Sequence, residues 1–375
     1  MVSWQSRINP QPMFDVLTMA RQRESMGHYV ARMEIGDTPG FRNDFIHELV
    51  TKYSSSPYRY SPSRGEDVLI AKVLETQWPN YHHENVVIGP ANFLITAALA
   101  SVTTPGDLVM LPDPGFATYK LAADFLGLKT HYYPVYQDGK PFFPNFNEFT
   151  FPRGLTPNAI IINNPSNPLG VAFESAQIFD SLQSLIRIGT RIIFDETYVN
   201  LVYDDTQSYV DDIEAIRLRS FSKENCAPGL RIGFAVANSI EAKTMSDLMS
   251  LSISCLPQFI QFAVAEYLGS QRAIEFTEEV KTEMTRRLQF LASAIPDGFL
   301  QTKSNAAFYA LVDMGTRGGD EGFSFLLNKN VSTCPGSKFG KNSKGSVRVS
   351  LAGSAKTFVT DVQMLSSALN EWGNP

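Results

Sequence analysis

The sequence predicts an α/β fold with a mostly parallel sheet, joined to a smaller α+β domain. Over most of the chain, short apolar runs alternate with longer amphipathic segments, which is typical of strands and helices that follow each other in turn. From about residue 257 the pattern changes to long helical stretches, then "AAFYALVDM", "VRVSLAG" and a last helix. We therefore expect a large domain of residues 38–256 and a small domain of residues 1–37 and 257–375.

The expected strands are short runs that are rich in β-branched residues and bounded by turn residues, as buried strands are. They are "VVI" at 86–88, "LVML" at 108–111, "AIIIN" at 159–163, "RIIF" at 191–194, "IRLRSF" at 216–221 and "RIGFAVA" at 231–237. Amphipathic stretches lie between them, such as "FATYKLAADFLG", which ends at Gly127, and "ESAQIFDSLQSLIRIG", which ends at Gly189. Glycine is a common residue at the end of a helix.

The composition excludes several classes of protein. The 375 residues are 43% hydrophobic and 19% charged, as in ordinary globular proteins. The 32 basic and 38 acidic residues give a net charge of -6 that is spread along the chain. Because there is no basic run, we expect no nucleic-acid partner and no binding to an acidic membrane.

The cysteines indicate whether the chain has disulfides or a metal site, and the apolar segments indicate its cellular location. Cys226, Cys255 and Cys334 are odd in number and widely spaced, which fits neither a disulfide framework nor a C-x-x-C metal site. We expect reduced thiols and no bound metal. The sequence shows no signal-peptide core and no segment of membrane-spanning length, so we expect a soluble, cytoplasmic protein.

Polar residues follow several of the apolar runs, where an open α/β sheet binds its ligands. Near Ala91 and Asn92, a turn runs into a helix whose first free N–H groups can hold an anion. The other candidates that follow strands are Asn164 and Asn167 in "NPSNPLG", Asp195 and Tyr198 in "DETYVNLVYDD", and Ser222 and Lys223 after "IRLRSF".

Each of these features also has a structural interpretation. Asn-Pro pairs commonly initiate turns, an aspartate that opens a loop is often a cap, and a lysine is usually solvated. The Gly-x-Arg-x-Gly around Arg231 can be no more than the entry to a strand. Their joint occurrence, in order and at the strand ends of one pattern, favours a shared binding site.

The ordered set "NPSNPLG", "DETY" and "SFSK" with "GLRIG" resembles the class I/II aminotransferases, fold-type I enzymes that use pyridoxal 5′-phosphate. Lys223 is followed eight residues later by Arg231 within S-x-S-K-x-x-x-x-x-G-x-R-x-G, which is a specific match. The similarity extends over nearly the whole chain. It includes "MEIGDTPGF", "YSPSRGE" at 60–66, "PDPGFATY" at 112–119, "CPGSKFG" at 334–340 and "VRVSLA" at 347–352. The resemblance implies a large domain with a mostly parallel, seven-stranded sheet.

The resemblance also implies how the cofactor is held. Lys223 would form a Schiff base with the cofactor aldehyde and later move the substrate's Cα proton. Asp195 would pair with the pyridine nitrogen, which makes the ring an electron sink. The cofactor phosphate would bind Ser220, Ser222, Arg231 and the backbone of Ala91 and Asn92.

Other residues would contact the ring. Asn167 and Tyr198 would form hydrogen bonds with its phenolic oxygen. Phe116 would stack on the ring face, although core packing is an alternative role for this side chain.

The substrate residues follow from the same resemblance. Arg348 in "VRVSLA" would clamp the α-carboxylate of the substrate, since a guanidinium holds a carboxylate with two hydrogen bonds. Gly36 would let the backbone approach this carboxylate, and Asn167 would assist. Tyr60 would reach across a dimer to the phosphate of the neighbouring site, which implies a homodimer with shared active sites.

The chain departs from the family pattern at several positions. Leu169 replaces the usual threonine of N-P-T-G, Pro90 stands where the phosphate turn normally has glycine, and "SNAAFYA" lacks the usual proline and glycine. No second arginine lies near "SISCLPQF", a region from which some relatives recruit a clamp for a side-chain carboxylate. Because a buried unpaired carboxylate is costly, this argues against aspartate or glutamate as the main donor.

The expected function is the transfer of an amino group from an L-amino acid to a 2-oxo acid or another carbonyl compound. The alternative is a pyridoxal-phosphate-dependent lyase, cyclase or decarboxylase, because such relatives share the cofactor residues. A non-catalytic binding protein is a more distant alternative. The presence of Lys223, Asp195 and Arg231 argues against it.

Overall fold

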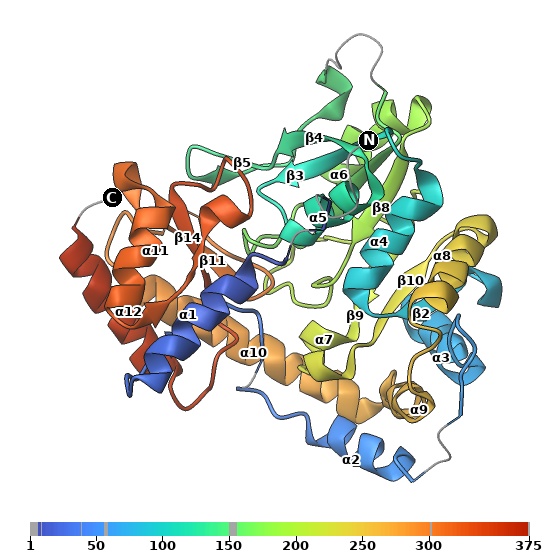
Figure 1. The fold of residues 1–375 in the computed structure, drawn as a ribbon, viewed down its shortest axis with the longest axis horizontal. Helices are drawn as coiled ribbons and strands as arrows, with labels where there is room; N and C mark the ends of the chain where they lie inside the picture. Colours follow the sequence, from blue (N-terminus) through green and yellow to red (C-terminus); the bar gives the residue numbers. More distant parts are fainter. Residues whose placement is uncertain are drawn as a thin grey trace.

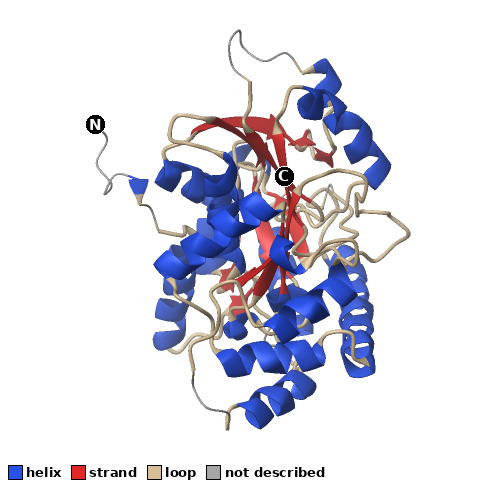
Figure 2. Cartoon of the chain, turned by 90° about the vertical axis from the view of Figure 1, so that its right-hand side faces the viewer, coloured by secondary structure: helices blue, strands red, loops and turns tan. Residues whose placement is uncertain are grey.

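The computed structural model describes residues 7–8, 10–38, 40–55, 59–149, 156–300 and 302–373. A seven-stranded sheet runs through the middle of the molecule with helices on both of its sides (Figures 1 and 2). In order across the sheet, its strands are β2 (Val86–Gly89), β10 (Gly233–Val236), β9 (Ile216–Ser220), β8 (Arg191–Asp195), β7 (Ala159–Asn163), β3 (Leu108–Asp113) and β4 (Lys129–Pro134). This arrangement confirms the predicted α/β fold and its seven strands.

The sheet is mostly parallel. Strands β9, β8, β7, β3 and β4 pair in parallel, whereas β10 is antiparallel to both β2 and β9. All six strands expected from the sequence form. The seventh, β4, has the sequence "KTHYYP" and lies at the edge of the sheet. Two of its six residues are exposed and three are partly exposed, and it has no apolar run by which it could be recognised.

Two hydrophobic cores cover the two faces of this sheet. Successive residues of a strand point to opposite faces, and accordingly Ile161 belongs to one core while Ile160 and Ile162 belong to the other. The core around Ile160 includes α6 (Ser175–Arg187). The core around Ile161 includes α2 (Asp44–Tyr53), α3 (Asp67–Gln77), α4 (Ala91–Val102), α5 (Ala117–Leu126), α8 (Ser239–Ser252) and α9 (Gln258–Tyr267).

A third core joins the two ends of the chain. It packs around an antiparallel sheet of β11 (Tyr309–Asp313), β14 (Ser346–Ser350) and β13 (Cys334–Pro335). The helices of this part are α1 (Met13–Ser25), α10 (Gln271–Ala294), α11 (Gly319–Asn328) and α12 (Phe358–Trp372). Near the N-terminus, β1 (Ala31–Arg32) pairs in parallel with β12 (Val331–Ser332). The N-terminal segment therefore packs against the C-terminal part of the chain (Figure 1). The division into a large domain of residues 38–256 and a small domain stays a prediction.

The remaining elements are short. The hairpin of β5 (Tyr136–Gln137) and β6 (Lys140–Pro141) follows β4, and α7 (Phe221–Glu224) follows β9. Single turns of 3₁₀ helix lie at His83–Asn85, Phe146–Glu148, Pro228–Leu230, Gly315–Arg317 and Gly336–Lys338. Among the helices that the structure describes, none is both long and apolar enough to cross a lipid bilayer.

Candidate active site

One cleft at the carboxyl ends of β7, β8 and β9 gathers the candidate residues. The side chains and backbone of twelve of them line it, although they come from segments between residues 36 and 348. They are Gly36, Ala91, Asn92, Phe116, Asn167, Asp195, Tyr198, Ser220, Ser222, Lys223, Arg231 and Arg348. Tyr60 does not line this cleft, and its side chain is 92% exposed.

Asp195 ends β8 and is buried in the floor of the cleft. Its Oδ2 accepts a hydrogen bond from the Tyr119 hydroxyl at 2.6 Å. Its Oδ1 accepts from the Thr197 hydroxyl at 2.6 Å and from the Thr197 N–H at 3.1 Å. Burial raises the pKa of the Asp195 carboxyl, and these hydrogen bonds oppose the rise. No cationic side chain of the described residues forms an ion pair with Asp195, so the carboxylate suits a cationic group of a ligand.

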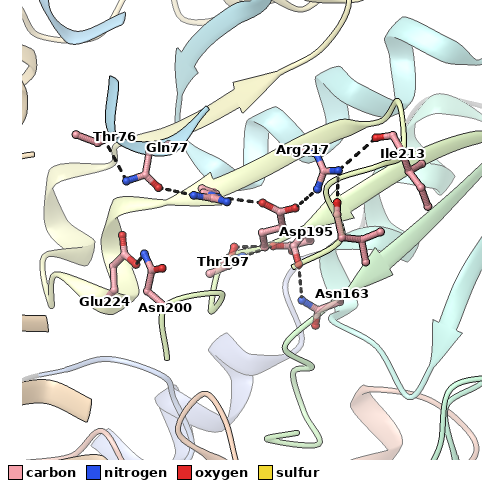
Figure 3. A network of polar contacts seen from close by, with 12 residues as sticks. Thr76, Gln77, Asn163, Asp195, Thr197, Asn200, Ile213, Arg217 and Glu224 are labelled. Carbon is pink, nitrogen blue, oxygen red and sulfur yellow. Dashed lines mark hydrogen bonds and ion pairs between the residues drawn. The ribbon is translucent and has the colours of Figure 1, made fainter. Parts of the chain in front are cut away.

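Asn163 connects the neighbouring strand ends. In the sheet it lies beside Asp195, and its Nδ2 donates to the Asp195 carbonyl oxygen at 3.2 Å (Figure 3). Its Oδ1 accepts from the N–H of Asn167 at 2.8 Å. Asn163 therefore fixes the loop that brings Asn167 into the cleft.

Lys223 reaches the cleft through the short helix α7. Ser220 caps this helix, because its hydroxyl accepts from the N–H of Ser222 at 3.2 Å. This cap explains why Phe221 begins a helix, whereas the sequence had suggested that it belongs to the preceding strand. The Nζ of Lys223 donates to the carbonyl oxygen of Gly36 at 2.7 Å.

Gly36 lies too close to its neighbours to carry a side chain. A Cβ at this position would lie 2.0 Å from the hydroxyl oxygen of Tyr309 and 2.9 Å from a ring carbon of Phe308. The glycine thus allows its carbonyl group to reach the lysine amine in a crowded part of the cleft.

Several donors suitable for an anion line the same cleft. Ala91 is the first residue of α4, and its N-cap Pro90 provides no side-chain cap, so the first N–H groups of the helix are free of a capping partner. The hydroxyls of Ser220 and Ser222 and the guanidinium of Arg231 also line the cleft. Arg231 has a left-handed backbone, with φ of 58°, and its Nη1 donates to Pro228 O at 2.9 Å. Pro90 lies at the N-cap, before the helical N–H groups, so it leaves this anion site intact.

Arg348 provides a buried guanidinium on β14. Its Nη1 donates to Oδ1 of Asn167 at 3.0 Å and its Nη2 to the carbonyl oxygen of Glu34 at 2.6 Å. The rings of Tyr309 and Phe339 lie 4.3 and 4.6 Å from the guanidinium carbon. These contacts hold the planar group in one orientation, which favours recognition of a carboxylate.

Buried tyrosines complete the cleft. The hydroxyls of Tyr198 and Tyr309 lie 3.1 Å apart, and the ring of Phe116 packs edge-on against that of Tyr119. Burial raises the pKa of Tyr119 and of Tyr198 well above the ordinary value of tyrosine. Both phenols therefore stay protonated and able to donate hydrogen bonds near neutral pH.

Eight further residues that the sequence did not single out also line the cleft. Tyr119 and Thr197 lie within the quoted motifs "PDPGFATY" and "DETY", so they could have been found there. Ile35 lies within the quoted "MEIGDTPGF" in the same way. Met13 carries no recognisable signal, because only the packing of the N-terminal segment brings it to the site. The full set is Met13, Ile35, Ile95, Tyr119, Asn163, Thr197, Pro228 and Tyr309.

The departures from the family pattern have structural explanations. Leu169 is fully buried in the core around Ile160 and does not line the cleft, so its apolar side chain suits its position. The segment "SNAAFYA" still presents its aromatic pair, since Tyr309 lines the cleft and the ring of Phe308 lies 5.9 Å from Nζ of Lys223.

Comparison with known proteins shows the family of the chain. The family model "Aminotransferase class I and II" matches residues 59–360, which is most of the chain. The chain belongs to this family. It is therefore an aminotransferase that depends on pyridoxal 5′-phosphate and adopts fold-type I.

Individual relatives of this aminotransferase are distant. A probable aspartate/prephenate aminotransferase from Aquifex aeolicus is 28% identical, and the match covers 98% of each chain. A (5-formylfuran-3-yl)methyl phosphate transaminase from Methanocaldococcus jannaschii is 27% identical over 95% of this chain and 96% of its own. The crystal structure of an aromatic aminotransferase from Pyrococcus horikoshii has a TM-score of 0.84 and 24% identity, covering 94% and 99% of the two chains.

The residues of the cleft fit pyridoxal 5′-phosphate. The buried Asp195 has no cationic partner of its own among the described residues and matches a protonated ring nitrogen. The helix N-terminus at Ala91 with the hydroxyls of Ser220 and Ser222 and the guanidinium of Arg231 matches a phosphate. Lys223 places a primary amine in the cleft, and a primary amine can bind an aldehyde.

Proposed function

We propose that this aminotransferase moves the amino group of α-amino acids with uncharged side chains to a 2-oxo acid, with Lys223, Asp195 and Arg348 as its main functional residues. The observation that carries the proposal is that one cleft contains a lysine amine, a buried carboxylate without a cationic partner and a rigidly held guanidinium. When bound, pyridoxal 5′-phosphate supplies the carbonyl group that takes up the amino group and the ring that accepts electrons from the substrate.

Lys223 moves the proton of the substrate's Cα. An amine is an effective acid and base when it lies within hydrogen-bond reach of the proton. The hydrogen bond from Nζ to the carbonyl oxygen of Gly36 supports this role, because it holds the amine inside the cleft. Asp195 keeps the ring nitrogen protonated, and Tyr119 and Thr197 hold the carboxylate in place.

The remaining cleft residues bind and orient. Ser220, Ser222, Arg231 and the backbone of Ala91 and Asn92 hold the phosphate. Phe116 packs on the ring, and Asn167 with Tyr198 donates hydrogen bonds to its phenolic oxygen. The free helix N-terminus and the raised pKa of Tyr198 support these assignments.

Arg348 binds the α-carboxylate of the substrate. The contacts with Glu34 and with the rings of Tyr309 and Phe339 leave the guanidinium fixed before substrate arrives. Little orientation entropy is then lost on binding, which favours productive geometry. Gly36 lets the carboxylate approach the backbone, and Asn167 shares the contact through its amide group.

The lining of the cleft supports a preference for uncharged side chains. Among the described residues, the cationic side chains that line the cleft are Lys223, Arg231 and Arg348. Each of them is assigned to binding the cofactor or the α-carboxylate. Met13 and Ile35, which also line the cleft, are apolar. A second carboxylate, on the side chain of the substrate, would therefore lose its hydration without pairing with a cationic residue of this chain, which costs free energy.

We expect leucine, methionine and phenylalanine to react with a kcat/KM that is at least about 10-fold higher than that of aspartate or glutamate, because an unpaired carboxylate costs more than about 1 kcal/mol on burial. The measurement mixes purified enzyme with one amino acid at a time and follows absorption as the cofactor converts to its amino form. Aspartate as the fastest donor would contradict the proposal. Release of ammonia or carbon dioxide in place of a 2-oxo acid would contradict the transfer reaction.

We further propose a homodimer in which Tyr60 completes the phosphate site of the second copy. Its 92% exposed ring supports this role, since a large exposed aromatic side chain is available to a partner. We expect sedimentation to show a dimer at assay concentrations.

We expect Tyr60→Phe to weaken cofactor binding about 10-fold, as the loss of a hydrogen bond to a charged group does. Tyr29→Phe is the control, because Tyr29 is also exposed but binds Asp361. A fully active monomer would overturn the shared site.

We also propose that the enzyme acts in the cytoplasm. Cys226, Cys255 and Cys334 are free thiols in the structure, which suits a reducing compartment. Fractionation of cells that express the untagged protein tests this location.

A further inference from the structure

Glu196 is a buried acidic residue that the proposed function does not use. It follows Asp195 directly at the end of β8. Consecutive residues of an extended chain point to opposite faces of a sheet, and Glu196 does not line the cleft although Asp195 does. Its side chain is only 4% exposed. A carboxylate buried behind the catalytic face needs specific partners.

The partners of Glu196 are two arginines on the neighbouring strand. Its Oε1 lies 2.6 Å from Nη1 of Arg217, and its Oε2 lies 2.9 Å from Nε of Arg219. The N–H of Glu196 also donates to the carbonyl oxygen of Leu218 at 2.8 Å. Glu196 thus links the end of β8 to β9 through its backbone and through both oxygens of its carboxylate.

Arg217 is itself held on several sides. Its Nη2 donates to the carbonyl oxygens of Val210 and Ile213, and its guanidinium lies 4.8 Å from the ring centre of Tyr209. Figure 3 shows the guanidinium of Arg217 directed toward the carbonyl group of Ile213. This arginine is 1% exposed, so it has little freedom to follow a displaced carboxylate.

Arg219 extends the same network toward α3. Its Nη1 donates to Oε1 of Gln77, the last residue of α3, at 2.6 Å. Its guanidinium lies 4.9 Å from the ring of Trp78 and 5.2 Å from that of Tyr209. Both arginines are therefore anchored independently of Glu196, and they define one position for its carboxylate.

The strands that Glu196 joins carry the two halves of the active site. Strand β8 ends at Asp195, and β9 leads directly into Ser220, Ser222 and Lys223. A shift between these strand ends would move the carboxylate relative to the lysine and to the phosphate-binding hydroxyls. Displacements of about 1 Å can lower the rate of an enzyme about 100-fold.

We propose that Glu196 is a positioning residue, which clamps β8 to β9 and thereby sets the place of Asp195 relative to Lys223 and to the serines. The inference rests on the proposed function of these residues. A buried ion pair adds little stability over well-packed apolar residues, because removing the charges from water offsets their attraction, although loss of one partner alone is destabilising. Its principal effect is therefore on geometry.

The matched control is Glu241, which makes a similar contact at the other end of the same strand. Its two carboxylate oxygens lie 2.6 and 2.7 Å from nitrogens of Arg191, the first residue of β8. Glu241 is also buried. It lies on α8 and does not line the cleft, so it reports the general cost of breaking a buried ion pair with this strand.

The experiment compares Glu196→Gln with Glu241→Gln. We expect Glu196→Gln to lower kcat about 10- to 100-fold with KM changed less than about 3-fold. We expect the cofactor-free protein to bind pyridoxamine 5′-phosphate about 10-fold more weakly in calorimetry. This compound lacks the aldehyde, so it reports the placement of the noncovalent contacts. Glu241→Gln should leave kcat and this affinity unchanged while lowering the unfolding temperature.

A fall in unfolding temperature alone, equal in the two variants, would overturn the inference and leave Glu196 as a stabilising residue. If Glu196→Gln does not fold, Arg219→Gln removes one of the two contacts and keeps the other with Arg217. It should lower kcat and the affinity in the same direction, and a normal kcat with a normal affinity would again overturn the inference. Normal activity of Asp195 and Lys223 variants would instead refute the proposed function.

Discussion

We expect Lys223→Ala to lower turnover by about 10⁴-fold or more, since proton transfer by a positioned amine alone contributes 10²- to 10⁴-fold and the covalent role is lost with it. Among the described residues, Lys223 is the only lysine that lines the cleft. The free helix N-terminus at Ala91, the two serines and Arg231 remain in the variant, so the cofactor should still bind noncovalently. Steady-state rates and the affinity for pyridoxal 5′-phosphate measure the two effects separately.

Borohydride reduction followed by peptide mapping identifies the lysine directly. In the unchanged enzyme we expect the label on the peptide that contains Lys223. Lys120→Ala is the control, because Lys120 lies on helix α5, pairs with Asp124 and does not line the cleft. This variant should keep its activity and its label. A label on another lysine, or appreciable turnover without Lys223, would remove this residue from its role.

The second large effect concerns Asp195. We expect Asp195→Asn to slow removal of the substrate's Cα proton by about 10³-fold, because a neutral amide cannot pair with a protonated ring nitrogen and a preorganised charge is worth several kcal/mol. Burial raises the pKa of the Asp195 carboxyl because it destabilises the charged form. A cation that enters the cleft stabilises this charged form. Single-turnover experiments with ordinary and Cα-deuterated amino acids measure the step.

A milder variant distinguishes the charge of Asp195 from the hydrogen bonds that hold it. Tyr119→Phe removes one of the hydrogen bonds to Asp195 and keeps the carboxylate, so we expect only about a 10-fold decrease, as for one hydrogen bond to a charged group. Near-normal single-turnover rates in Asp195→Asn would exclude Asp195 as the partner of the ring. A larger effect in Tyr119→Phe than in Asp195→Asn would assign the main role to the tyrosine.

Much of the fold could be predicted because its main strands are buried. Strands such as β7 and β8 are short apolar runs between turn residues, and burial on both faces makes such runs recognisable. Strand β4 was missed because an edge strand can carry polar and exposed side chains. The end of β9 was misplaced by one residue, since the Ser220 cap begins a helix at Phe221.

The residues at the strand ends were predictable for a related reason. Asp195 and Lys223 stand immediately after buried strands or within one turn of them, and parallel strands bring their carboxyl ends to one edge of a sheet. The order and spacing of these residues along the chain are therefore enough to indicate a common cofactor site, and the motif around Lys223 indicates which cofactor it holds.

The partners of these residues depended on packing. Lys223 donates to Gly36, which is 187 residues away, and Arg348 donates to Glu34 across 314 residues. Met13 reaches the cleft only because the first helix packs against the last third of the chain. Such contacts leave no periodicity in the sequence, since they join side chains from segments that meet only when separate hydrophobic cores form. Local sequence therefore determined the elements and the chemistry of the site, whereas tertiary packing decided which groups hold and orient the reactive side chains.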